Sequence, residues 1–129
     1  MTAGTDPAPV TFDTEEAVTV ARFAGTEISS LEAIDELLLA FRNKIDTLGA
    51  QALVIDFTGM RFIATGAINL LLVVLKRMRL KGGDVYLCGV TGNVEQVFRL
   101  LQINKLFELF PSRAEAMRIL RGRNIGKRP

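Results

Sequence analysis

The apolar and polar positions in the middle of the chain predict a strand, a helix and a second strand. Residues 52–57 (ALVIDF) form an apolar run that is too short for a surface helix. Residues 66–81 read as a largely apolar helix that Gly82 and Gly83 end after several cations, and residues 84–87 (DVYL) form the second strand. Two buried strands joined through a helix favour a parallel pair with a right-handed crossover.

In such sheets, binding loops gather at the carboxyl ends of the parallel strands. The loop of residues 58–65 leaves the first of these strands at that end and leads directly into the helix. This loop and the first turn of the helix are therefore the first candidate for a functional site.

The N-terminal part predicts a β-hairpin followed by an amphipathic helix. Residues 10–13 and 17–23 are short β-rich runs, and residues 14–16 between them read as a hairpin turn. Ser29 and Glu32 have the spacing of a capping box, so Ser29 is the predicted N-cap of the helix. Apolar residues recur along this helix at steps of three and four and predict one buried stripe: Leu31, Ile34, Leu38, Phe41, Ile45 and Leu48.

The C-terminal part predicts two further helices with a strand between them. Asn93 is the candidate cap of the first, residues 106–110 read as the strand, and Ser112 with Glu115 forms a second capping box. The third helix has an apolar stripe of Val94, Val97, Phe98 and Leu101. The chain thus predicts an α/β single domain with a mixed, mostly parallel sheet of about five strands, an N-terminal hairpin and about four helices.

Length and composition fit this fold. A chain of 129 residues with 49% hydrophobic and 23% charged residues is typical of one folded domain. We expect a disordered leader over residues 1–8, the domain over residues 9–122 and a basic tail over residues 123–129. The tail has no aromatic side chain to stack a base, so no nucleic-acid partner is expected. Without a signal peptide or an apolar run long enough to span a membrane, the sequence predicts a cytoplasmic protein.

The side chains that carry most metal and acid–base chemistry are scarce. The chain has no His and one Cys, which argues against an ordinary zinc site and removes the commonest general base. Cys88 follows Leu87 and reads as a small buried hydrophobic residue. Asp13, Glu15 and Glu16 lie at the predicted hairpin turn and read as solvated charges. We expect no metal, no cofactor and no enzymatic activity.

The segments ALVIDFTGMRFIATGAINLLL and GGDVYLCGV resemble a STAS domain, the module of bacterial anti-sigma factor antagonists and of sulfate-transporter tails. The mark of this family is a strand that ends in Asp, followed by a Phe-Ile/Met-Asp-Ser-Ser/Thr-Gly turn that opens a helix. The resemblance continues through VEQVFRLLQINKLFEL and covers nearly everything from Ala17 to Leu120. It implies a STAS-like fold and a role in binding other proteins.

This chain departs from the family pattern at the phosphorylated turn. In the antagonist branch, the partner kinase phosphorylates the Ser or Thr just before the glycine of the turn. Aligned without gaps, Ala64 replaces the Asp, Thr65 the first Ser and Gly66 the phosphoacceptor; with one residue deleted before Ala64, Thr65 becomes the acceptor. We prefer the gapless register because both flanks agree on it. The family's other acid, before the first helix, is also replaced, and Ser29 stands nearest its position.

The start of the helix remains a candidate site without the resemblance. With Thr65 as the N-cap, backbone N–H groups in the first turn of the helix stay free to bind an anion or an acidic side chain. The alternative is that Thr65 caps the helix and has no further role. The helix also has more apolar residues than one sheet-covering stripe needs, which predicts either a docking surface or a wider core contact. The candidate partner-binding residues are Ala64, Thr65, Gly66, Asn69, Leu72, Val73 and Lys76, and Thr65 is also the candidate phosphoacceptor.

Three classes of function fit these features. The leading one is a regulatory module that binds an anti-sigma factor or a serine-kinase-like partner and is not switched by phosphorylation at the usual site. The second is an accessory subunit of a membrane transporter. The third is a regulator that binds a small anion or a nucleotide at the start of the helix. A homodimer is compatible with each.

Overall fold

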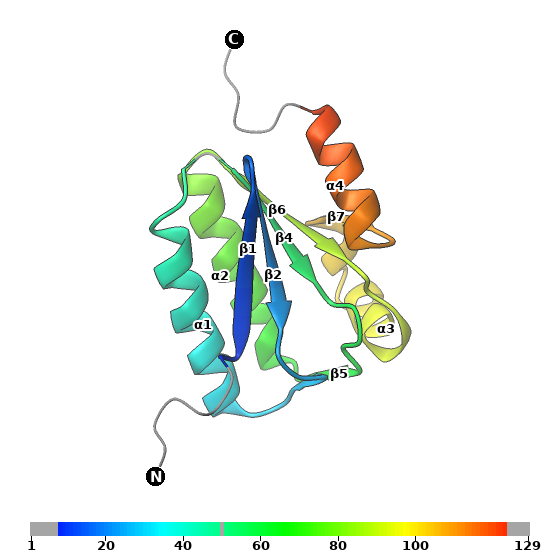
Figure 1. Cartoon of the computed structure of the whole chain (residues 1–129). Coiled ribbons are helices and arrows are strands. Elements are labelled where there is room, and N and C mark those ends of the chain that lie inside the picture. Colours follow the sequence, from blue (N-terminus) through cyan, green and yellow to red (C-terminus); the bar gives the residue numbers. More distant parts are fainter. Residues whose placement is uncertain (1–7, 50, 124–129) are drawn as a thin grey trace.

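The computed structural model describes residues 8–49 and 51–123 and shows a central five-stranded sheet with helices on both faces (Figure 1). The strands follow the order β1 (Val10–Glu15), β2 (Val18–Phe23), β4 (Ala52–Asp56), β6 (Asp84–Cys88) and β7 (Glu108–Phe110). The first two pair antiparallel and all other neighbours pair parallel. The predicted mixed, mostly parallel sheet with an N-terminal hairpin is confirmed. The expected leader and basic tail fall mostly or wholly in residues 1–7 and 124–129, outside the described residues.

The helices cover the two faces of the sheet unequally. Their bounds are α1 (Leu31–Ile45), α2 (Gly66–Leu80), α3 (Gly92–Leu100) and α4 (Arg113–Gly122). Helices α1 and α2 lie side by side on one face, whereas α4 lies on the other (Figure 1). Side chains alternate along each strand, so Leu53 and Ile55 join the core beneath α1 and α2, while Val54 joins a second core beneath α4.

The hairpin turn is shorter than predicted. Glu15 pairs with Val18, so the turn consists of Glu16 and Ala17 alone, with Glu16 at a φ of 55°. A two-residue turn follows the natural twist of paired strands, and this extends β1 through Glu15.

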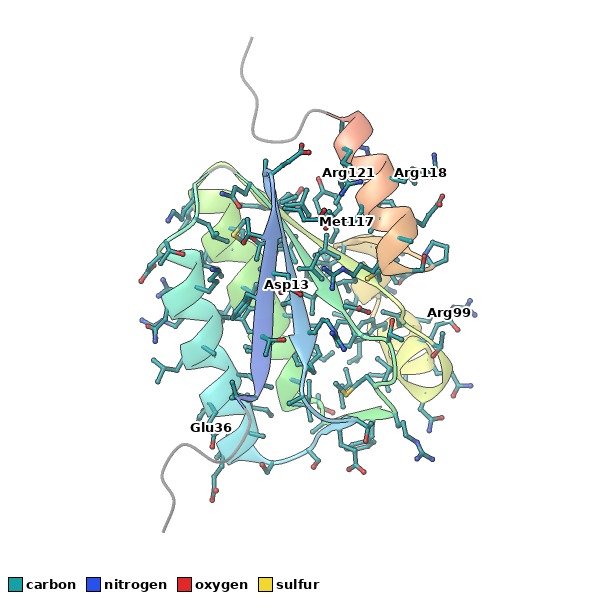
Figure 2. The ribbon with its side chains drawn as sticks, in the orientation of Figure 1. Asp13, Glu36, Arg99, Met117, Arg118 and Arg121 are labelled. Carbon is teal, nitrogen blue, oxygen red and sulfur yellow. The ribbon has the colours of Figure 1, made fainter. Side chains whose placement is uncertain are left out.

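Acidic side chains of β1 form exposed ion pairs with arginines of α4. The Asp13 carboxylate lies 3.6 Å from Arg113, and that of Glu15 lies 2.7 Å from Arg121. Figure 2 shows Asp13 on the strand and Arg121 on the facing helix. Both acids remain exposed, as predicted for solvated charges, and they form ion pairs because the sheet brings α4 beside a strand about a hundred residues away in sequence.

Helix α1 begins one residue later than predicted. Its N-cap is Ser30, whose Oγ accepts a hydrogen bond from the Ala33 N–H at 3.0 Å. The buried stripe is Leu37, Phe41 and Ile45, whereas Leu31 is 75% exposed. Steps of four residues keep these three side chains over the sheet, and Leu31 at the first position points away from it.

The C-terminal elements also begin at other residues than predicted. Helix α3 starts at Gly92 after Thr91, so Asn93 is inside the helix and is not its cap. Strand β7 starts at Glu108, because a short 3₁₀ turn, η1 (Ile103–Lys105), precedes it. The predicted Ser112 cap is confirmed by its bond from the Glu115 N–H. Among the described residues, no helix is both long and apolar enough to cross a membrane.

The position of the α1 cap gives a test of this boundary. Replacement of Ser30 by Ala removes an acceptor for a helix N–H group and should lower the free energy of unfolding by about 1 kcal/mol. Replacement of the neighbouring Ser29 by Ala is the matched control and should change it by less than about 0.5 kcal/mol. Urea denaturation of the two variants would measure both values. A larger loss for Ser29→Ala would place the cap where the sequence pattern put it.

Candidate functional site

The candidate site begins at a carboxylate where β4 leaves the sheet. Asp56 is 9% exposed, and its Oδ1 accepts hydrogen bonds from the Thr58 N–H at 2.9 Å and the Thr58 hydroxyl at 2.6 Å. The Phe57 N–H donates to the Cys88 carbonyl at 2.8 Å. These bonds fix the direction in which the chain enters the following loop.

The loop after β6 packs against this turn through a glycine. Gly89 has a φ of +70°, and a Cβ placed on it would lie 2.4 Å from the Thr58 hydroxyl oxygen and 2.8 Å from the Thr58 nitrogen. No larger residue fits there without moving the backbone of the Asp56–Thr58 turn. The close approach of the two loops thus depends on glycine at this position.

A two-stranded parallel sheet, β3 (Glu27–Ile28) and β5 (Phe62–Ile63), holds the next part of the site. The Arg61 N–H donates to the Thr26 carbonyl, and the Ala64 N–H donates to the Ile28 carbonyl, both at 2.7 Å. The segment before α1 therefore runs beside the turn that opens α2. Ser29 and Ala64 lie close to one another across this pairing. The family pattern implies an acid at the position of Ala64 and a second acid near Ser29.

Thr65 does not cap α2, contrary to the prediction. Its φ of −55° and ψ of −34° are already helical, and its side chain makes no capping hydrogen bond. A capping side chain needs an extended backbone to fold back onto the helix N–H groups, so the hydroxyl of Thr65 cannot do this. The Ala67 N–H bonds instead to the Ala64 carbonyl at 2.9 Å, which gives a tight first turn. Thr65 and Gly66 are both exposed.

The outer side of α2 carries exposed apolar residues. Leu72 and Val73 are each 37% exposed, and Asn69 and Lys76 are exposed beside them, whereas Leu70 is buried. Leu70 therefore belongs to the core, and the other two reach the surface. The docking surface itself stays a prediction.

Leu72 and Val73 point to different flanks of α2, because consecutive helical residues are about 100° apart. Leu72 lines an open groove of about 320 Å³ together with Leu75, Lys76, Arg79 and Leu80. Val73 lies on the flank nearer α1, as does Arg77, which is 4.0 Å from Asp46 of that helical region. Phe62, 48% exposed on β5, adds an aromatic side chain beside the turn that sequence reasoning did not include in the site.

Cys88 has the single thiol of the chain and is buried near the Asp56 carboxylate. Cys88 is fully buried, and burial, with the charge and hydrogen bonding of Asp56, raises its pKa to about 12. The thiol therefore stays protonated at neutral pH, and its interpretation as a small buried hydrophobic residue is confirmed. In residues 8–49 and 51–123, no group of three or more metal-binding side chains is found.

Residues 11–116 match the STAS domain family. The chain belongs to this family. Its fold is similar to that of an anti-sigma factor antagonist (STAS) domain protein from Planctomyces limnophilus, with a TM-score of 0.77 and 21% identity over 86% of this chain and 96% of the other. It is also similar to the unphosphorylated anti-sigma factor antagonist SpoIIAA, with a TM-score of 0.75 and 16% identity over 88% and 96% of the two chains.

The STAS fold of this chain also resembles part of a membrane transporter. The inward-facing murine anion transporter Slc26a9 matches with a TM-score of 0.69 and 14% identity. The match covers 82% of this chain but only 18% of the transporter. These likenesses establish the fold.

The contact between Gly89 and Thr58 predicts a steric cost at the base of the site. Gly89→Ala should destabilise the protein by more than Gly92→Ala, a matched control that also has a positive φ but nothing within 4 Å of its Cβ position. The control should lose roughly 1–2 kcal/mol for the unfavourable backbone conformation alone. Equal losses in urea denaturation would show that the two loops do not approach as described.

Proposed function

We propose that this STAS domain is a non-enzymatic regulatory module that binds a protein partner in the manner of anti-sigma factor antagonists. The observation that carries the proposal is the set of exposed apolar side chains on α2 and just before it: Phe62 beside the turn that opens the helix, and Leu72 and Val73 at the middle of the helix. Exposed apolar side chains beside polar ones are typical of docking surfaces. Similarity to two structures of anti-sigma factor antagonists favours a partner of the anti-sigma or serine-kinase class.

We further propose that phosphorylation at the start of α2 does not control this binding. The gapless register puts Gly66, which has no hydroxyl, at the acceptor position. Ala64 and Ser29 replace the neighbouring acids, so the turn lacks the charged groups of the family pattern. Thr65 is exposed and its hydroxyl makes no capping bond, so the local geometry does not argue against a phosphate at Thr65. The proposal depends on the register and on the missing acids.

Leu72→Asp should reduce capture of the partner at least about tenfold, because it puts a charge into an apolar contact. The variant should keep its free energy of unfolding within about 1 kcal/mol, because Leu72 is partly exposed. Pull-down from the native host, with the captured protein identified by mass spectrometry, would measure the first effect, and urea denaturation the second. Leu70→Asp is the matched control and should unfold the domain. If Leu72→Asp also unfolds it, or if capture is unchanged, the docking surface is wrong.

Protein purified from its native host should show a single unphosphorylated mass. Gly66→Ser provides the missing hydroxyl, and its added Cβ contacts only the end of the Ile34 side chain at 3.1 Å. If the host contains a kinase for this turn, only that variant should gain a species ~80 Da heavier in intact-mass analysis. Such a species in the wild type that disappears in Thr65→Val would show that the alternative register is correct and that the switch is retained.

The similarity to part of Slc26a9 supports a second candidate function, an accessory subunit of a membrane transporter. The same pull-down separates the two. Recovery of an anti-sigma factor or a serine kinase supports the first proposal, and recovery of a transporter subunit supports the second.

A further inference from the structure

One flank of α2 carries an open groove of about 320 Å³, here called the α2 groove. Residues from the second half of the helix line it: Leu72, Leu75, Lys76, Arg79 and Leu80. Gly66 and Arg77, which lie next to Ile34 and Asp46 of the α1 region, are on the opposite flank. The α2 groove therefore faces away from α1, the helix that lies beside α2 in Figure 1.

The floor of the α2 groove is apolar and lies below its rim. Leu75 is only 6% exposed, whereas Leu72 is 37% and Leu80 78% exposed. An occupant must therefore insert a side chain between the two outer leucines to reach Leu75. A flat lipid surface cannot do this, but a side chain that projects from a folded segment can.

The spacing of the lining residues matches a contact between two helices. Counted from Leu72, they stand at i, i+3, i+4, i+7 and i+8, which is the stripe that one helix presents to another. From Leu72 to Leu80 this stripe is about 12 Å long, a little over two turns. The backbone groups of α2 are bonded within the helix, so an extended segment would lack the main-chain partners that it finds at a sheet edge. The shape that fits is a helix of at least two turns.

The charge of the α2 groove is positive. Among the described residues, those that line it include two cations and no acid. Arg79 lies 3.3 Å from Asp84 in an exposed ion pair. Lys76 is exposed and occurs in none of the ion pairs found among residues 8–49 and 51–123. A carboxylate on the occupant can therefore pair with Lys76 without breaking an existing ion pair.

The other cations near the end of α2 have partners on the side of α1. Arg77 lies 4.0 Å from Asp46, and the Lys81 Nζ donates hydrogen bonds to the carbonyls of Ile45 and Asp46 at 2.8 and 3.2 Å. Cations at the end of a helix are also stabilised by its dipole. The dipole accounts for positive charge at this end of α2, but it does not account for the exposed leucines beside Lys76.

We propose that the α2 groove binds an acidic amphipathic helix of the protein partner. Apolar side chains of that helix insert against Leu75, and its Asp or Glu residues pair with Lys76 and Arg79. This inference rests on the proposed function and deepens it, because it names the chemistry of the partner segment that makes the contact. A basic helix would meet two like charges at the same place.

Charge reversal in the full chain tests the acidic character of the partner helix. The variant Lys76→Glu, Arg79→Glu should lower capture of the partner from native-host extract at least about tenfold, because like charges then face one another. The variant Arg42→Glu, Lys105→Glu makes the same change in net charge at exposed positions outside the groove, and it should capture the partner as the wild type does. Circular dichroism checks that both variants fold. If the reversed variant does not fold, Lys76→Gln, Arg79→Gln replaces it and should also lose capture.

A cross-linker at the rim of the α2 groove identifies the segment that binds there. Burial raises the pKa of Cys88 to about 12, so this thiol stays protonated and out of reach of a maleimide reagent. Leu80→Cys therefore accepts benzophenone-maleimide at one position. After irradiation in native-host extract, mass spectrometry should find it joined to a partner segment with Asp or Glu among apolar residues spaced by three and four. Leu39→Cys, on the exposed side of α1, is the control and should not yield that segment.

Three results would overturn the acidic helix: undiminished capture by the charge-reversed variant, cross-links from Leu80→Cys to a basic segment, or cross-links to lipid or to a second copy of this chain. The proposed function is tested separately by Leu72→Asp. If Leu72→Asp loses capture while the charge-reversed variant keeps it, the proposed function stands and the acidic helix alone is wrong. A wild type that captures no partner would overturn both.

Discussion

Burial of β4 on both faces is the constraint on which the rest of the structure depends. All five of its residues are buried, with Leu53 and Ile55 beneath α1 and α2 and Val54 beneath α4. A strand in this position has no exposed face and must be covered by helices on either side, which requires parallel neighbours joined by crossover helices. The order of elements along the chain follows from this requirement.

The same constraint creates the site. At the carboxyl end of β4 the chain leaves the sheet, and Asp56 fixes this turn by accepting two hydrogen bonds from Thr58. Gly89 allows the loop after β6 to pack closely against the same turn. The β3–β5 pair then guides the chain into α2. The start of α2 is held by these contacts, so the turn can vary in sequence without loss of the fold. The proposed loss of the family's acids and acceptor is therefore compatible with the fold.

The two sides of α2 differ in burial. Its inner side holds Leu70, Leu71 and Val74 against the sheet, all nearly inaccessible to solvent. Its outer side keeps Leu72 and Val73 partly exposed among polar and basic residues. Apolar residues that the core does not need stabilise the folded domain little, and the proposed docking surface would account for their presence.

The sequence by itself determined the fold class, the order of elements and the buried strands, because periodicity and runs of apolar residues are local signals. It left open which apolar residues of α2 reach the surface, and the tertiary structure showed that Leu72 and Val73 do. The sequence did not determine the contacts between distant segments. The β3–β5 pairing escaped it, since two residues per strand carry no readable period. The pairing of Asp13 and Glu15 with arginines of α4 escaped it for a similar reason, since only the sheet brings those segments together. The cap of α1 was misplaced because the neighbouring residues Ser29 and Ser30 look alike in sequence. Thr65 was taken as the cap of α2 although its helical backbone does not let its side chain cap the helix. Only the backbone conformation, set by tertiary contacts, decides which Ser or Thr accepts the hydrogen bond.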